Sequence, residues 1–422
     1  MARKMKDSGI EWIGEIPEGW KLVKLKYLSA FPVEKNIDPN SPYIGLENIE
    51  SWSGKYIPSN SQFDKSQALI FSKGDILFGK LRPYLAKVFF AFDSGCCSSE
   101  FCIMTFSSNL NAHYYWNILI SPTFINEVTQ STYGTKMPRA NTDFIRNIFV
   151  PVPSKNDQNQ IAEYLNIECS RIDAILSKTR SSIEEYKKLK QAVITQAVTK
   201  GVRGEREMKD SGVEWIGEIP WEWDVTKIGR IGQTSSGATP LRSKETSFFD
   251  DATIRWVRTL DLNDGLVYDS SERITELALS MSACSIMPTG TVCVAMYGGA
   301  GTIGKCGLLM TPCATNQAVC SIICNSNVIL PKFLLNQLLA LKPYWMKYAV
   351  GTRKDPNISQ DIVARMKVLI PPLSEQKEIV DYLDAKCAEI DGLIAKKEQL
   401  VKELESYKKS LIYEVVTGKR EV

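Results

Sequence analysis

The run GAGTIGKC, residues 299–306, has the glycine and lysine spacing of a loop that wraps around nucleotide phosphates. Such a loop ends in Ser or Thr, whose hydroxyl holds magnesium, but Cys306 stands in that place. The residues that follow, GLLMTPCATNQAVCSII, predict strands, whereas a phosphate loop opens a helix. We therefore predict no nucleotide site, but a glycine-rich turn that presents Lys305.

Two further motifs could indicate catalysis. The tetrad NSPY, residues 40–43, is similar to the Asn-Pro-Pro-Tyr loop with which amino-methyltransferases hold adenine, but Ser41 replaces the first proline. No strand followed by GxGxxG lies nearby to bind a methyl donor, so a turn that enters a strand is favoured. His113 is the one histidine and lies in the aromatic, helical stretch LNAHYYWNILI without an identifiable Ser or Cys partner. We predict a packed or surface histidine and no catalytic residue.

Cysteine usage and hydropathy exclude other classes. The eleven cysteines are odd in number, scattered and without a CxxC pair, which predicts reduced, mostly buried thiols and no metal site. No apolar run approaches the roughly 20 residues that cross a bilayer, and the opening MARKMKDSG has no signal-peptide core. We expect a cytoplasmic protein that makes no membrane contact.

The charge is nearly balanced. The formal net charge is +3, with 44% apolar and 23% charged residues, as in ordinary globular proteins. Residues 1–203 contain 25 basic against 20 acidic residues, and residues 204–422 contain 26 against 28. This excludes a histone-like basic surface. A nucleic-acid partner would have to be held by local patches or with help from other subunits.

Polar and basic residues in loops marked by glycine or proline are the candidates for reading DNA bases. Two such loops occupy equivalent places, YGTKMPRAN and GTRKDPNIS; they contain Lys136, Arg139 and Asn141, and Arg353, Lys354 and Asn357. A second group comprises Lys80, Arg82 and Tyr84 in the first half of the chain, and Arg242, Lys244 and Lys305 in the second. For each residue, a solvated surface charge is the alternative.

The elements that position these loops occur twice. The stretch MKDSGIEWIGEIPEGW at 5–20 returns as MKDSGVEWIGEIPWEW at 208–223, and QNQIAEYLNIECSRIDAIL at 158–176 returns as QKEIVDYLDAKCAEIDGLI at 376–394. The middles differ: residues 74–101 correspond by position to residues 290–319 but share little. Both middles are rich in Val, Ile, Phe and Tyr between Gly, Pro and Ser breaks, which predicts two compact α+β domains.

The second repeat predicts two long helices. Its apolar residues recur every three or four positions, and each stripe runs for about 40 residues. The predicted stripes are Ile161, Leu165, Ile172, Leu176, Ile183, Tyr186, Val193 and Ala197, and then Ile379, Leu383, Cys387, Ile390, Ile394, Val401, Leu404, Leu411 and Val415. Prolines at Pro151 and Pro153, and at Pro371 and Pro372, are expected to stop the preceding strands. A helix of this length cannot bury its stripe alone, so we predict an antiparallel coiled coil. The alternative is that each helix lies on its own domain.

Several stretches together resemble the specificity subunit of a Type I restriction-modification system. They are SGIEWIGEIPEGW, GDILFGKLRPYL with CSSEF, MPRAN, PPLSEQKEI and YKKSLIYEVVTGK, and they follow the order of the family along essentially the whole chain. The resemblance implies two target-recognition domains at residues 1–153 and 204–371, which alternate with conserved long helices at residues 154–203 and 372–422. It implies an α+β fold, an antiparallel helix pair and an approximate internal twofold.

The resemblance also implies a function. Each recognition domain would read one half of a bipartite, asymmetric sequence in double-stranded DNA, and the chain itself would catalyse nothing. Two modification subunits, which carry S-adenosylmethionine and methylate adenine, would dock on the chain, in part through the signature 5–20 and its copy. Restriction subunits with ATP and Mg would join them, and this chain would hold no cofactor. A scaffold that joins two proteins without touching DNA is the alternative; the divergent middles argue against it.

Overall fold

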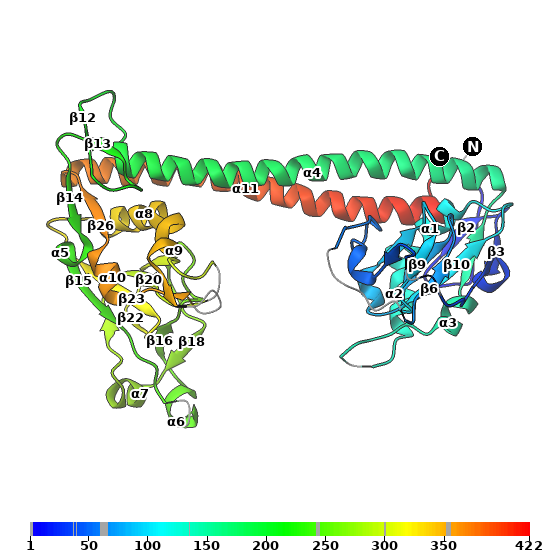
Figure 1. Ribbon diagram of the computed structural model, residues 1–422, viewed down its shortest axis with the longest axis horizontal. Coiled ribbons are helices and arrows are strands. Elements are labelled where there is room, and N and C mark those ends of the chain that lie inside the picture. The colour runs from blue at the N-terminus through cyan, green and yellow to red at the C-terminus, as the bar shows by residue number, and fades with distance from the viewer. Residues whose placement is uncertain are drawn as a thin grey trace. The chain divides into compact units, whose positions relative to one another are not determined.

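Two long helices run through the chain, and each contributes to two compact units (Figure 1). The computed structural model describes residues 3–36, 38, 40–59, 66–134, 136–241, 245–298, 301–351 and 356–422. Unit 1 comprises Met1–Arg180 and Glu398–Val422, and unit 2 comprises Ser181–Lys397. The division falls within the helices α4 (Lys155–Lys200) and α11 (Leu373–Val416), so each unit holds one middle segment and one part of both helices.

Within each unit the two helices pair side by side in opposite directions. In unit 1, Lys408 of α11 donates to Asp173 of α4 at 2.6 Å, and Arg180 pairs with Glu405. In unit 2, Lys190 of α4 donates to Asp391 of α11 at 2.6 Å. Residue numbers rise along one helix as they fall along the other. The predicted stripes are buried or half-buried throughout. The antiparallel coiled-coil pairing is therefore confirmed within each unit.

The middle segments of the two units share one topology. The strands of unit 1 are β1 (Met5–Asp7), β2 (Glu15–Pro17), β3 (Lys21–Lys24), β4 (Ser29–Ala30), β5 (Tyr43–Ile44), β6 (Leu69–Phe71), β7 (Ile76–Gly79), β8 (Val88–Phe90), β9 (Gly95–Cys97), β10 (Phe101–Phe106) and β11 (Phe149–Val152). Its short helices are α1 (Ala112–Leu119), α2 (Pro122–Gln130) and α3 (Thr142–Asn147).

Unit 2 has more strands in the same plan. Its strands are β12 (Met208–Asp210), β13 (Glu218–Pro220), β14 (Asp224–Lys227), β15 (Gly232–Ser236), β16 (Ile254–Val257), β17 (Gly265–Val267), β18 (Glu272–Ile274), β19 (Ile286–Met287), β20 (Val292–Ala295), β21 (Cys306–Leu309), β22 (Cys313–Thr315), β23 (Val319–Cys324), β24 (Val350–Gly351), β25 (Pro356–Asn357) and β26 (Lys367–Ile370). Its short helices are α5 (Ile228–Ile231), α6 (Glu245–Phe249), α7 (Glu276–Met281), α8 (Pro331–Leu341), α9 (Trp345–Tyr348) and α10 (Gln360–Arg365).

The strand orders show the duplication. Unit 1 has sheets β4-β10-β7-β8 and β5-β9-β6, and unit 2 has β15-β23-β20-β21-β17 and β18-β16-β22-β19. Without β17 and β18 the orders coincide, and so do the directions, including one parallel pair in each unit, β5 with β9 and β16 with β22. The expected α+β domains with an internal repeat are thus observed, although their sequences share little.

Each copy of the repeated signature packs against the C-terminal end of a long helix. Trp12, Ile13, Ile16 and Trp20 are buried in one core with Leu411, Ile412, Val415 and Val416, at the C-terminal end of α11. Trp215, Ile216, Ile219 and Trp223 share a core with Ile194, Ala197 and Val198, at the C-terminal end of α4. Each copy of the signature therefore packs against the helix of the other repeat, and this contact explains why the stretch occurs twice.

A buried glutamine fixes the start of each long helix. Gln376 donates from Nε2 to the carbonyls of Val328 and Pro371 at 2.9 Å and accepts from the Leu330 N–H at 2.8 Å. The equivalent Gln158 donates to the Pro153 carbonyl and accepts from the Asn111 N–H. Pro371 and Pro372 precede α11 as expected, but Pro151 lies inside β11, where it pairs with Leu22 of β3. The expectation that Pro151 stops the strand is wrong, because β11 is an edge strand, where a missing N–H can be tolerated.

Asp173 anchors unit 1 through two lysines, Lys408 at 2.6 Å and Lys55 at 3.0 Å. Burial alone would raise the pKa of Asp173, but hydrogen bonds and charge from Lys408 and Lys55 hold this pKa below its usual value. The ionised carboxylate therefore contributes stability above about pH 3.9, which is lost as the pH falls through the lowered folded pKa. We expect Asp173→Asn to lower the free energy of unfolding by about 2 kcal/mol at pH 7. Its deficit should shrink toward pH 3 in urea titrations; an equal deficit at both pH values would contradict this.

Candidate nucleic-acid interface

The two groups of predicted reading residues in the first middle segment converge on one surface. The Arg82 N–H donates to the Pro138 carbonyl at 2.7 Å, and the Ala140 N–H donates to the Lys80 carbonyl at 2.9 Å. Leu81 and Arg139 form an isolated bridge between the two segments. Residues 80–84 and 136–141 are therefore one continuous surface, although 50 or so residues separate them in the chain.

The side chains on this surface differ in their exposure and in the partners they already have. Arg82 and Lys136 are exposed, Tyr84 is 46% exposed and Lys80 is half-buried. Arg139 pairs with Glu100, so its charge is already matched. Asn141 caps α3: its side-chain oxygen accepts from the Asp143 N–H at 2.8 Å.

The same loop presents two residues that the sequence prediction missed. Tyr133 is 59% and Met137 is 62% exposed, and both flank the predicted basic residues. The Tyr133 N–H donates to the Arg139 carbonyl, which ties it to the turn. These two side chains add exposed apolar area to the surface that carries Arg82 and Lys136, and their exposure is not visible from spacing alone.

In the second middle segment, only part of the prediction falls on described residues. Arg242, Lys244, Arg353 and Lys354 lie outside them. Asn357 forms a bridge with Tyr297, and the Ile358 N–H donates to the Met296 carbonyl at 3.0 Å, as Ala140 does to Lys80. Lys305 accepts at its carbonyl from the Ala295 N–H, which matches the bond from Gly79 to Lys87. The structure thus brings Asn357 to the equivalent surface and places Lys305 on the strand that returns from the turn, at the position equivalent to Lys87 in unit 1.

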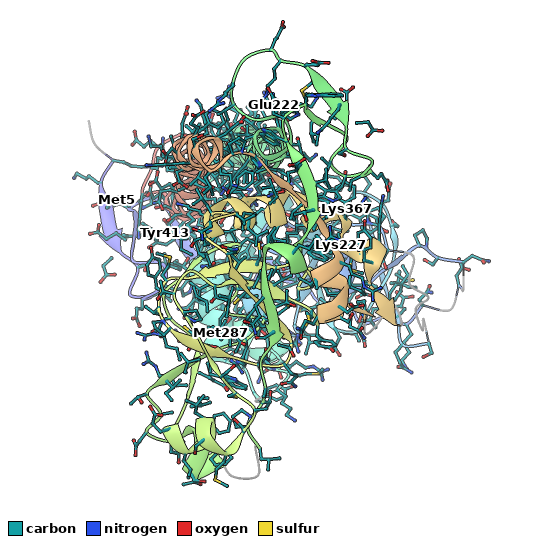
Figure 2. The ribbon with its side chains drawn as sticks, turned by 90° about the vertical axis from the view of Figure 1, so that its left-hand side faces the viewer. Met5, Glu222, Lys227, Met287, Lys367 and Tyr413 are labelled. Carbon is teal, nitrogen blue, oxygen red and sulfur yellow. The ribbon has the colours of Figure 1, made fainter. Side chains whose placement is uncertain are left out.

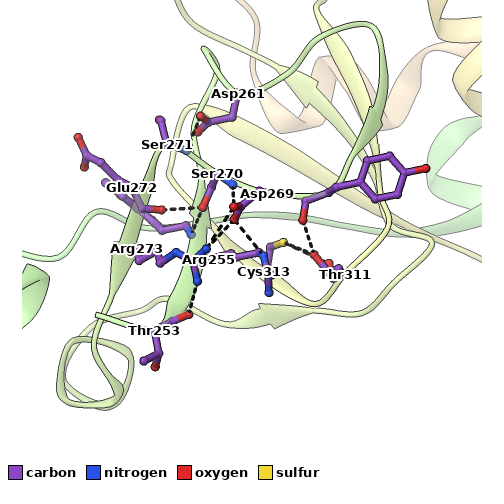
Figure 3. A network of polar contacts seen from close by, with 12 residues as sticks. Thr253, Arg255, Asp261, Asp269, Ser270, Ser271, Glu272, Arg273, Thr311 and Cys313 are labelled. Carbon is purple, nitrogen blue, oxygen red and sulfur yellow. Dashed lines mark hydrogen bonds and ion pairs between the residues drawn. The ribbon is translucent and has the colours of Figure 1, made fainter. Parts of the chain in front are cut away.

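Arg255 and Arg273, on the second sheet of unit 2, donate to one carboxylate and hold a loop in place (Figure 3). Asp269 accepts from Arg255 Nε at 3.1 Å and from Arg273 at 3.0 Å, and Ser270 donates its hydroxyl to the Glu272 carbonyl. Asp269 is exposed, and its pKa is lowered first by the backbone hydrogen bond from Ser270 and then by the two arginines. The carboxylate matches the charge of these arginines and holds the connection between β17 and β18, so the network fixes a loop.

The motifs that could indicate catalysis have ordinary structural roles. Cys306 begins strand β21, and the next elements are the strands β22 and β23, not the helix that a phosphate loop opens; residues 299–300 lie outside the described part. His113 lies on α1 and stacks on Phe90 with ring centroids 3.7 Å apart, and burial lowers its pKa. All eleven cysteines are free thiols, and burial raises the pKa of Cys97 and Cys293 to about 12.

Unit 1 also contains a cavity of about 1160 Å³. Its lining includes both polar and aromatic side chains, the aromatic ones being Tyr43, Trp52, Tyr56, Phe71, Phe89, Phe90, Phe92 and Trp116. Within the described ranges, no three His, Cys, Asp or Glu side chains gather as a metal site would require. The described helices include none that is both long and apolar enough to span a membrane.

Comparison with known families decides among the remaining interpretations. The family model for the Type I restriction modification DNA specificity domain matches twice, at residues 17–185 and 220–403. The chain belongs to this family. The two matches correspond to the two repeats, so the family's domain occurs once in each.

Similar proteins support the assignment, one of them over nearly the full length. The Type I restriction enzyme MjaVIII specificity subunit of Methanocaldococcus jannaschii is 24% identical over 422 residues, covering 96% of this chain and 93% of that protein. The EcoDI specificity subunit of Escherichia coli is 24% identical over 188 residues, covering 43% and 42%.

Solved structures show the same fold. A chain from work on complex assembly and conformational transition of the type I R-M system has a TM-score of 0.78 at 18% identity, covering 96% of this chain and 99% of that one. The HsdS subunit from Thermoanaerobacter tengcongensis has a TM-score of 0.53, also at 18% identity, and covers 96% and 98%.

Proposed function

We propose that this chain is the non-catalytic specificity subunit of a Type I restriction-modification enzyme and reads a bipartite, asymmetric DNA sequence, one half with each middle segment. The observation that carries the proposal is one strand topology, present in both units, that ends in unlike loops at the same place: Lys80 to Arg82 in one and Met296 to Gly298 in the other. Two domains with the same strand topology but different loops are suited to reading two different half-sites at a fixed separation. A scaffold for two equal partners would not need unlike loops.

We further propose that the helix pair holds two modification subunits, one on each unit. In unit 1, Ile175 and Tyr407 are exposed apolar residues on the paired helices, and their equivalents in unit 2, Leu393 and Leu189, are exposed as well. Repeated exposed apolar residues on a helix face indicate protein contacts. The apolar face of the signature is buried inside its own unit, so only its outer face, which includes the exposed Trp221, could take part in such docking.

The reaction would then be divided among subunits. The modification subunits would bind S-adenosylmethionine and methylate adenine, and the restriction subunits would bind ATP with Mg. This chain would contribute base contacts and position. The scaffold alternative differs in one respect, since it predicts that changing a middle segment leaves the methylated sequence unchanged.

Exchange of one middle segment tests the proposal. Lys227 and Lys367 are paired residues at the ends of β14 and β26 and lie side by side (Figure 2). Both junctions of an exchanged segment 227–367 would therefore lie next to each other in the fold. We expect mapping of methylated adenines in host DNA to show a bipartite motif in which the exchange alters one half only. A change in both halves, or in neither, would refute the assignment.

A further inference from the structure

The turn after β7 holds an arginine in a backbone conformation that the second repeat gives to glycine. Arg82 has φ 51° and Ala86 has φ 49°, and both lie in the left-handed region. Counting from the matched hydrogen bonds, Arg82 corresponds to Gly298 (φ 133°) and Ala86 to Gly304 (φ 76°). Both repeats thus require positive φ at the same two positions, and only the first repeat places side chains there.

Ala86 and Arg82 lie in different environments. Ala86 is buried, so its methyl group packs in the core of unit 1. Arg82 is exposed, and among the residues that the structure describes its guanidinium has no ion pair or hydrogen bond. A side chain other than glycine costs stability in this region, and neither packing nor pairing within the described structure offsets that cost at Arg82.

The backbone around Arg82 is held firmly. Its N–H donates to the Pro138 carbonyl at 2.7 Å, and its own carbonyl accepts from the Leu85 N–H at 2.9 Å. Pro83 follows it, which restricts the turn further. The side chain therefore leaves from a fixed point on the candidate interface, where the backbone is bonded to Pro138 of the loop 136–141.

We propose that Arg82 is a specificity-determining residue that recognises one guanine in the half-site read by the first middle segment. This inference rests on the proposed function. An arginine fork matches the O6 and N7 acceptors of guanine in the major groove, and a fixed backbone makes that match selective. A phosphate contact requires no such position, because lysine or arginine on any nearby loop can supply it.

Arg82→Gly tests the proposal because it should raise the stability of the chain while it lowers the discrimination for one base. Relief of the left-handed strain should raise the melting temperature of the full chain by about 2–4 °C. Loss of the guanidinium should reduce discrimination for one guanine by about tenfold or more. The readout is the map of methylated adenines in cells that carry the variant with its native partner subunits. One position of one half should accept other bases, while the second half stays unchanged.

Two variants serve as controls. Arg82→Asn removes the charge and introduces a residue that tolerates positive φ better than arginine does, so it should relax the same position with a smaller gain in stability than Arg82→Gly. Ala86→Gly alters the backbone of the same turn without touching an exposed side chain, and it should leave the motif unchanged.

The outcomes separate this inference from the proposed function. If the unaltered chain gives no bipartite motif, the proposed function fails. If it gives one and Arg82→Gly leaves both halves intact, only the role of Arg82 fails. Uniformly weaker methylation with an unchanged motif would indicate a phosphate contact and would overturn the assignment, as would a lower melting temperature with loss of the whole motif.

Discussion

Replacing Glu375 with glutamine is expected to lower the free energy of unfolding by about 3–5 kcal/mol. Glu375 is 2% exposed and accepts from Arg206 and, at 3.1 Å, from Trp223 Nε1. The Arg206 guanidinium also lies 5.3 Å from the Trp223 ring centroid. The variant would leave Arg206 largely buried without a matching charge, and this uncompensated burial dominates the expected loss.

The first repeat provides a matched control. Asp157 stands at the equivalent place, and Arg3 approaches it at 3.8 Å while lying over Trp20 at 5.4 Å. Both partners are about one-third exposed, so Asp157→Asn should cost no more than about 1 kcal/mol. Urea titrations of the full chain measure both variants. Equal losses would show that burial of Glu375 does not determine the strength of the contact.

The sequence predicted the features that depend on local periodicity. A stripe at three- and four-residue spacing specifies which helix face is buried, so residues such as Leu165 and Leu383 could be assigned to the helix pair before the structure. The two repeats implied two equivalent frames, and the strand orders confirm them.

Contacts between distant segments could not be predicted in this way. No local sequence pattern indicates that residues 80–82 form backbone hydrogen bonds with residues 138–140, or that Glu100 forms an ion pair with Arg139. The packing of the signature could not be predicted either, because the apolar partners at the C-terminal helix ends belong to the helix of the other repeat. The positive φ of Arg82 is a property of the folded turn, and an arginine in the sequence gives no sign of it.

Lengthening both long helices together is expected to lengthen the spacer of the DNA motif and to leave its halves unchanged. An insertion of seven residues after Arg180 and another after Lys397 adds about 10.5 Å to each helix, which corresponds to about three base pairs at 3.4 Å per step. Seven residues are close to two full turns, so the apolar stripe keeps its face to within about 20°.

The insertion must be made in both helices because the pairs on either side of it are antiparallel. Asp173 with Lys408 lies on one side and Lys190 with Asp391 on the other, and equal insertions preserve both. Insertion after Arg180 alone would shift one helix against its partner, and we expect that variant to give no methylation motif. If the double insertion changed the half-sites, or left the spacer at its original length, the helix pair would not set the separation of the two half-sites.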